Sequence, residues 1–159
     1  MHTGEERHNR QLTQRWLELL EGSLEVGATV ELPVLSNSML PAFGIGRKIK
    51  IRRVHWKYCS TSDIIVFREG RKLTAHRLLF ALRMGRKCYF YQKGDSSPCG
   101  HFIRSDRVVG RVVEYQDGKG NYRSVSSATV SNTPRIRVFL CVLSSLWEQT
   151  RRLVGRMFD

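Results

Sequence analysis

Residues 63–95 read DIIVFREGRKLTAHRLLFALRMGRKCYFYQKGD. Short apolar stretches alternate here with the turn-forming pairs Glu69-Gly70, Met84-Gly85 and Gly94-Asp95, which is the pattern of consecutive β-strands. The same pattern extends to both sides, and the segments that we expect to form strands are 29–35, 48–54, 63–67, 73–82, 88–92 and 108–115. Many short strands with little helix between them predict a mostly β fold, in which an antiparallel sheet is rolled or partly closed.

Helices are expected near the two ends of the sequence. Residues 11–22 place leucine and tryptophan side chains on one helical face and end in glycine. Residues 135–158 have the composition of a second amphipathic helix that is basic on one side. We therefore divide the chain into an N-terminal helix with a lead-in strand (1–34), a β core (35–117), a loop or linker rich in Ser, Thr, Asn and Gly (118–134), and a basic C-terminal helix (135–159).

The size and composition are those of a single folded domain. The chain has 159 residues, of which 41% are apolar and 26% charged. A domain of this size buries enough core to hold a fixed active site without metals or disulfides. The cysteines form no C-x-x-C pair and no zinc-like spacing with histidines; they are Cys59, Cys88, Cys99 and Cys141. We expect free thiols, no metal site and no cofactor.

The net charge is unusual. Lys and Arg number 27 against 14 Asp and Glu, which gives a net charge of +13. A field of this sign attracts nucleic acid, an anionic membrane surface or an acidic peptide. The basic residues are spread along the chain, so a solvated basic surface without a specific partner explains the composition equally well.

The sequence shows no pattern for export or for crossing a membrane. Its first residues contain no apolar core of the kind found in secretory signals. Residues 138–147 form an apolar run, but a membrane span needs roughly 20 apolar residues. We expect a cytoplasmic protein, with peripheral contact between its basic C-terminal segment and an anionic membrane as an alternative.

Three short motifs carry residue types that are used in nucleophilic catalysis. Ser38 lies in residues 36–41, SNSMLP, where a strand passes into a turn that would expose its hydroxyl group. His76 lies within an apolar strand, and an imidazole there can accept a serine proton near neutral pH. Asp95 lies in a turn, from which its carboxylate could orient an imidazole. Each residue also has an ordinary structural interpretation, as a turn serine, a core histidine and an Asx-turn aspartate.

The order of these motifs resembles signal peptidase I, above all its endoplasmic-reticulum and archaeal branch. Ser38-Met39-Leu40-Pro41 is similar to the Ser-Met-x-Pro box of that family, His76-Arg77-Leu78 to its His-Arg-Val box, and Lys93-Gly94-Asp95 to its Lys-Gly-Asp box. Two strands resemble it as well, SDIIVF at residues 62–67 and VVGRV at residues 108–112. These boxes follow the family's order over residues 35–113, and we take residues 35–117 as the peptidase core.

The resemblance implies a serine endopeptidase that cleaves a signal peptide or a leader-like segment of a precursor protein. Ser38 would attack the scissile carbonyl, and His76 would take its proton and return it to the leaving amine. The backbone N–H of Ser38 and the hydroxyl of Ser36 would stabilise the oxyanion. The implied fold is the rolled sheet of the LexA/signal-peptidase type, with small substrate residues on the acyl side of the cut.

The chain departs from the family pattern at several places. Gly46-Arg47 replaces a Gly-Asp pair, and Ser62 replaces a glycine. Residues 98–101 read PCGH where the endoplasmic-reticulum branch carries a further acidic residue. The orienting carboxylate is then Asp95, or less favourably Asp106, or the site is a Ser-His dyad. Signal peptidases are usually anchored by transmembrane helices, so this chain would touch the membrane peripherally or act on a soluble precursor.

Two other functions stay open. A LexA-type or phage-repressor relative would cleave itself with a Ser-Lys dyad, and Lys72 is close to His76 in sequence, but the residues before Ser38 are too few for a helix-turn-helix domain. A non-catalytic nucleic-acid-binding module would use the net charge and aromatic residues beside basic ones, which are Trp56, Tyr58, Tyr89, Phe90 and Tyr91. Aromatic residues in strands are more often core residues, which makes nucleic acid the less favoured partner.

Overall fold

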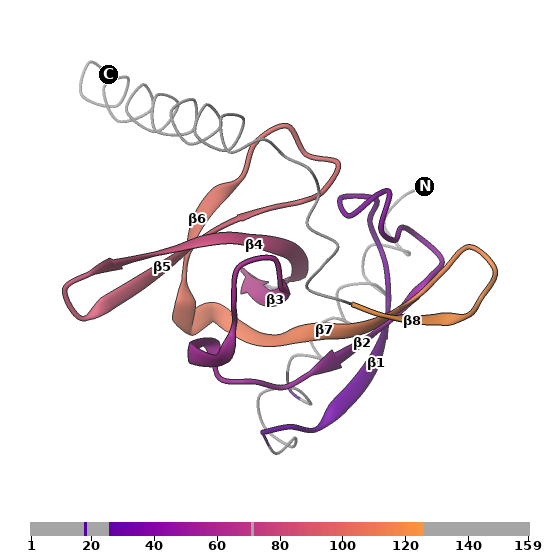
Figure 1. Cartoon of the computed structure of the whole chain (residues 1–159), viewed down its shortest axis with the longest axis horizontal. Coiled ribbons are helices and arrows are strands. Elements are labelled where there is room, and N and C mark those ends of the chain that lie inside the picture. Colours follow the sequence, from indigo (N-terminus) through magenta and orange to yellow (C-terminus); the bar gives the residue numbers. More distant parts are fainter. Residues whose placement is uncertain (1–17, 19–25, 71, 126–159) are drawn as a thin grey trace.

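The computed structural model of the chain describes residues 18, 26–70 and 72–125 (Figure 1). The strands are β1 (Thr29–Pro33), β2 (Lys48–Arg52), β3 (Ile64–Glu69), β4 (Lys72–Met84), β5 (Lys87–Lys93), β6 (His101–Arg104), β7 (Val108–Gln116) and β8 (Tyr122–Ser124). Short 3₁₀-helices, η2 (Trp56–Tyr58) and η3 (Ser105–Arg107), lie between strands. The prediction of a mostly β fold is confirmed. The helices expected at residues 11–22 and 135–158 lie, apart from residue 18, outside the described residues.

All of these strands belong to one antiparallel sheet. Its order is β1-β2-β7-β3-β4-β5-β6, and β8 pairs with β7 beside this path. The long strand β7 pairs first with β3 and then with β2 and β8. The sheet is not closed, because β1 and β6 form its two ends. Figure 1 shows the β4–β5 hairpin extending away from the part of the sheet that holds β1, β2 and β8.

Strand β3 carries the core on both of its faces. Its residues Ile64-Ile65-Val66-Phe67 alternate between the faces, as side chains of a strand do, and none is more than 2% exposed. Ile64 and Val66 belong to a cluster with Leu32, Val34, Met39, Phe43, Ile49, Ile51 and Val112. Ile65 and Phe67 belong to another, with Leu78, Phe90, Ile103 and Val108. The apolar run at 63–67 therefore marks the strand between two cores.

Strand pairing also brings polar side chains from three strands to one face of the sheet. His76 of β4 lies opposite Ile65 of β3. Gln92 of β5 lies opposite Leu78, two residues beyond His76 and so on the same face of β4. His101 of β6 lies opposite Gln92. The register thus aligns His76, Gln92 and His101 across neighbouring strands.

Strands β6 and β8 were not predicted from the sequence. Residues 101–104, HFIR, lack an apolar run, and β8 is exposed throughout. β8 also lies within 118–134, where we expected a loop or linker. Both strands form by pairing with a neighbour, β6 with β5 and β8 with the end of β7. Such pairing is set by tertiary context and leaves little trace in local composition.

Within the described residues, no helix is long and apolar enough to cross a membrane, and no group of His, Cys, Asp and Glu could hold a metal ion. Among the described residues, Cys59, Cys88 and Cys99 are not part of a disulfide, whereas Cys141 lies outside the described residues. Burial raises the pKa of the Cys59 thiol to about 11. Because the thiolate is the nucleophilic form, Cys59 has the character of an inert, structural thiol.

Candidate catalytic site

Ser38 lies in a tight turn between β1 and β2. Met39, which is 1% exposed, anchors this turn in the core, and the N–H of Leu40 donates to the carbonyl of Asn37 at 3.1 Å. The side-chain oxygen of Asn37 accepts a hydrogen bond from the N–H of Ile45 at 3.0 Å. Ser38 itself is partly exposed. The nucleophile candidate is therefore held at a bend by buried and hydrogen-bonded neighbours.

The turn also brings the hydroxyl group of Ser36 beside that of Ser38. The two Oγ atoms are 3.2 Å apart, and either hydroxyl can donate. A hydroxyl group beside the candidate nucleophile is placed as a donor in an oxyanion hole has to be.

The Lys93-Gly94-Asp95 turn packs directly on the Ser38 turn. The N–H of Ser96 donates to the carbonyl of Ser38 at 3.0 Å, and its hydroxyl group donates to the carbonyl of Asn37 at 3.0 Å. The second turn is closed by a hydrogen bond from the N–H of Ser97 to the carbonyl of Gly94. Hydrogen bonds thus join two motifs that lie far apart in the sequence.

Gly94 lies where the Ser38 turn and His76 meet. A Cβ atom at this position would lie 2.6 Å from the carbonyl oxygen of Ser38 and 3.0 Å from Nε2 of His76. Both atoms therefore border one point in space, which stays open because residue 94 has no side chain. The structure brings together the backbone of the predicted nucleophile and the imidazole of the predicted base.

The two ring nitrogens of His76 have different surroundings. Nε2 lies beside Gly94, whereas Nδ1 lies 2.5 Å from Oε1 of Gln92. The half-buried ring also makes an edge-on contact with Phe67, with 6.0 Å between the ring centroids. Burial lowers the pKa of His76 below its ordinary value of 6.5, and the hydrogen bond with Gln92 acts in the opposite direction. The neutral imidazole, which is the form of a general base, is thus favoured.

Gln92, which the sequence analysis did not single out, is the partner of His76 at Nδ1. Its side chain is fully buried, and its Nε2 lies 2.7 Å from Nε2 of His101. Oε1 of Glu69 lies 3.5 Å from the same nitrogen of His101. The available sequence signal was a polar residue within the aromatic strand CYFYQ at 88–92, just before the Lys-Gly-Asp box.

Asp95, expected to orient His76, is paired with Arg77. Nε and Nη2 of Arg77 donate to the two carboxylate oxygens at 2.8 and 2.7 Å, and Nη1 donates to the carbonyl of Ser62 at 3.0 Å. Because Arg77 is only 5% exposed, this is a buried bidentate ion pair. The charge of Asp95 raises the pKa of His76, but less than the other neighbours of that ring affect it.

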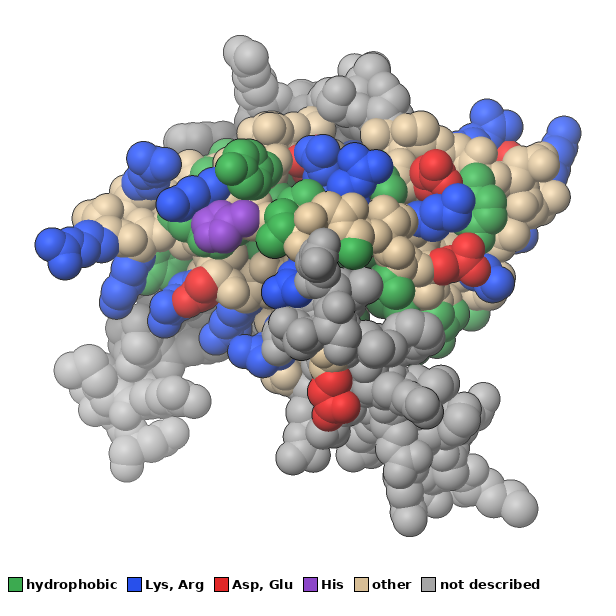
Figure 2. All heavy atoms as spheres, turned by 90° about the horizontal axis from the view of Figure 1, so that it is seen from below, with side chains coloured by type: hydrophobic (Ala, Val, Ile, Leu, Met, Phe, Trp, Pro, Cys, Tyr) green, Lys and Arg blue, Asp and Glu red, His purple; other side chains and the backbone are tan. Residues whose placement is uncertain are grey.

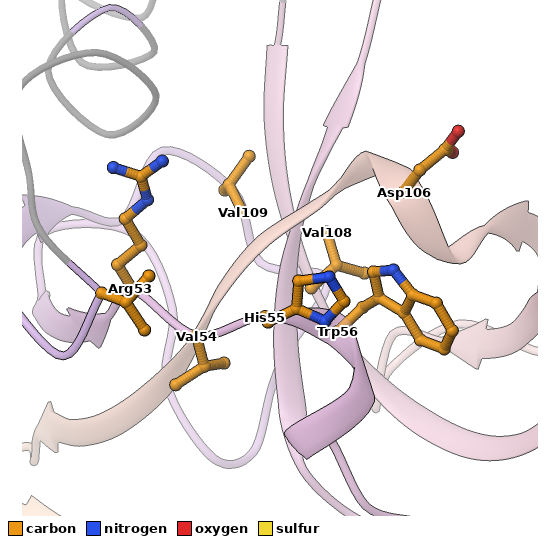
Figure 3. Close-up of a pocket in the computed structure, with 8 residues that line it drawn as sticks. Arg53, Val54, His55, Trp56, Asp106, Val108 and Val109 are labelled. Atoms are coloured by element: carbon orange, nitrogen blue, oxygen red, sulfur yellow. The ribbon is translucent and has the colours of Figure 1, made fainter.

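Asp106, the second carboxylate considered, lies in η3 and is paired with Arg104. It borders a hollow of about 320 Å³ that is lined by Val26, Arg53, Val54, His55, Trp56, Val108 and Val109. Figure 3 shows its carboxylate directed away from the rings of His55 and Trp56. Ser38 and His76 are not among the residues that line this hollow.

Lys72, the base of the alternative Ser-Lys scheme, is exposed at the start of β4, opposite Glu69. Since a strand rises about 3.3 Å per residue, the Cα atoms of Lys72 and His76 are roughly 13 Å apart. His76, in contrast, has its Nε2 beside Gly94.

The aromatic residues considered for nucleic-acid binding are divided between core and surface. Phe90 and Tyr91 are 2% and 0% exposed, and the ring of Trp56 packs edge-on against Phe90. Tyr58 is 71% exposed. Figure 2 shows Lys and Arg side chains distributed over one face of the molecule with carboxylates between them.

Comparison with known protein families found none that matches this chain, and comparison with curated proteins found no match either.

Proposed function

We propose that the chain is a serine endopeptidase of the signal-peptidase type, with Ser38 as nucleophile and His76 as general base. The observation that carries this proposal is the position of Gly94, against which the carbonyl oxygen of Ser38 and Nε2 of His76 both lie. The order of the sequence boxes supports it, since the Ser-Met-x-Pro, His-Arg and Lys-Gly-Asp segments meet at this point. With it we propose the rolled sheet of the LexA/signal-peptidase type as the fold.

The reaction would proceed through an acyl-enzyme. Ser38 Oγ attacks the scissile carbonyl carbon while its proton passes to Nε2 of His76. The C–N bond then breaks, and His76 returns that proton to the leaving amine. A water molecule next attacks the ester, giving a proton to Nε2, and the proton returns to Ser38 Oγ as the carboxylic acid product leaves. The low pKa of His76 keeps Nε2 free to accept a proton at neutral pH.

Two donors near Ser38 would stabilise the oxyanion. The backbone N–H of Ser38 is one, and the hydroxyl of Ser36, whose Oγ lies 3.2 Å from Ser38 Oγ, is the other. Loss of a single oxyanion donor typically lowers the rate about 10²- to 10³-fold. Ser36→Ala should then lower kcat by up to that factor without affecting the core.

The segment that carries Ser38 supports an apolar peptide substrate. Leu35, Leu40 and Ile45 are 53%, 43% and 62% exposed, so apolar surface is available on both sides of the nucleophile in sequence. An extended signal or leader segment of a precursor would cover this surface. Peripheral contact of a chain with a net charge of +13 with an anionic membrane would bring a cytoplasmic enzyme close to such precursors.

The test is cleavage of a library of leader-like peptides by the purified full chain, read by mass spectrometry beside Ser38→Ala. We expect cuts after small residues by the wild type and none by Ser38→Ala with an intact fold. Equal cutting by both proteins would show a contaminating protease. Absence of cuts by a folded wild type, with and without anionic vesicles, would refute the proposal.

The LexA-type alternative is tested by a separate reaction. Self-cleavage is intramolecular, so its rate would not depend on protein concentration, and it would yield two fragments of this chain. Fragments that require Lys72 and not His76 would favour the self-cleaving regulator over the endopeptidase.

A further inference from the structure

Gln92 is a fully buried amide with an imidazole at each end. Its Oε1 lies 2.5 Å from Nδ1 of His76, and its Nε2 lies 2.7 Å from Nε2 of His101. The ring of Phe67 packs edge-on against both imidazoles, with centroid distances of 6.0 and 6.5 Å. The three polar side chains therefore form a continuous chain of hydrogen bonds on a buried aromatic support.

An amide in such a chain fixes the direction of the hydrogen bonds. Its oxygen can only accept, and its nitrogen can only donate. With Oε1 toward His76, Nδ1 of His76 must carry a proton, which leaves the lone pair on Nε2 beside Gly94. With the amide turned over, Nδ1 would have to accept, and the proton would move to Nε2. Only the first arrangement leaves His76 able to take a proton from Ser38.

We propose that Gln92 is a positioning residue that holds His76 in the tautomer with the proton on Nδ1, and that His101 sets the direction of the Gln92 amide. Neutral His101 accepts from Nε2 of Gln92 through its own Nε2 and keeps its proton on Nδ1. This inference rests on the proposed role of His76 as base, and it assigns to a neutral amide the place for which the sequence suggested a carboxylate.

The charged groups around His76, Gln92 and His101 indicate when this direction of the hydrogen bonds would be lost. Glu69 lies 3.5 Å from Nε2 of His101 at the end of β3, and its other oxygen accepts from Thr74. The charge of His101 on β6 acts on His76 across Gln92 and lowers its pKa, while Asp95 is held by Arg77. A protonated His101 could no longer accept from Gln92 through its Nε2. The amide would then turn over, and His76 would lose the lone pair on Nε2.

The experiment is nitrogen NMR of the full chain labelled with ¹⁵N-histidine, because imidazole nitrogen shifts report which nitrogen carries the proton. Spectra are recorded at a pH where imidazoles are neutral, and the His76 signals are assigned by their loss in His76→Ala. We expect a proton on Nδ1 of His76 in the wild type. In Gln92→Leu, which removes both hydrogen bonds at similar volume, we expect His76 to shift to the other tautomer and kcat to fall about 10²-fold or more with little change in KM.

Three further variants separate positioning from a loss of folding. Gln92→Glu keeps an acceptor at Nδ1, so the tautomer and the cleavage should be retained, while the rate–pH profile moves to higher pH by about one unit or more because a carboxylate favours the imidazolium. His101→Phe, which keeps a ring but leaves the amide direction unset, should give a mixture of both tautomers. Gln116→Leu, which removes a surface glutamine bonded to the carbonyl of Gly120, is the matched control and should change neither property.

The outcomes distinguish this inference from the proposed function. A proton on Nε2 of His76 in the wild type, or an unchanged tautomer in both folded Gln92→Leu and His101→Phe, would overturn the positioning role. If the tautomers change as expected but the wild type cleaves no peptide, the hydrogen-bond network stands and the proposed peptidase function fails.

Discussion

Replacing Gly94 by alanine tests whether the Ser38 turn and His76 meet as the structure shows. The new Cβ would lie 2.6 Å from the carbonyl oxygen of Ser38, 2.8 Å from Oγ of Ser97 and 3.0 Å from Nε2 of His76. An ordinary contact begins at 3.4 Å, so the backbone oxygen has to move by about 0.8 Å. Displacements on the order of 1 Å in a reacting constellation lower rates about 10²-fold.

The effect on folding should be smaller than the effect on catalysis. Overpacking by one methyl group typically lowers the free energy of unfolding by about 1–3 kcal/mol. The control is Gly118→Ala, because a Cβ at Gly118 meets nothing within 4 Å. We expect Gly94→Ala to lose about 10²-fold in kcat/KM for a cleaved peptide while it still unfolds cooperatively in urea, and Gly118→Ala to retain both properties. A Gly94→Ala enzyme with activity within threefold of wild type would show that the two motifs do not meet at this point.

The remaining predictions concern the base and the ion pair behind it. His76→Ala should abolish peptide cleavage, whereas Lys72→Ala should retain most of it, and the reverse result would establish the Ser-Lys scheme. The rate of peptide cleavage should rise with pH through the pKa of His76, which lies below 6.5 because burial disfavours the imidazolium, since the active base is the neutral ring. A cleavage rate that rises only well above pH 8 would contradict His76 as the base. Asp95→Asn should lower the free energy of unfolding, measured in urea, by up to about 3 kcal/mol, because it leaves the buried cation of Arg77 without a counter-charge. A decrease below about 0.5 kcal/mol would show that the ion pair contributes little to stability.

Much of the sheet could be predicted because its strands carry local signals. The apolar run at 63–67 is buried on both faces as β3, and the turns at Glu69-Gly70 and Met84-Gly85 separate β3, β4 and β5 as expected. β6 and β8 could not be predicted, since they are short, lack an apolar run and exist through their pairing with β5 and β7. Their order in the sheet follows from contacts between distant segments, which composition does not reveal.

The candidate site, too, could be predicted only where its residues carry a local sequence signal. Ser38 and His76 could be singled out because serine and histidine have recognisable chemistry in a turn and in an apolar strand. Gln92 could not, because a glutamine at the end of an aromatic strand gains its importance only when β4, β5 and β6 align it with two imidazoles. The exposed fraction of 0% and the hydrogen bond at each end of the amide are properties of the folded sheet, not of the strand that carries the residue.

The His-Arg box and the Lys-Gly-Asp box each contribute two neighbouring residues to the candidate site. His76 and Gly94 meet beside Ser38, while the next residues, Arg77 and Asp95, meet in a buried bidentate pair. Side chains of adjacent strand residues point to opposite faces, so Arg77 lies on the other side of β4 from His76. The ion pair therefore attaches the Gly94 turn to the face of β4 opposite His76, and it holds Gly94 beside Nε2 of His76. On this interpretation Asp95 of the Lys-Gly-Asp box positions the turn, and Gln92 orients His76, the proposed base.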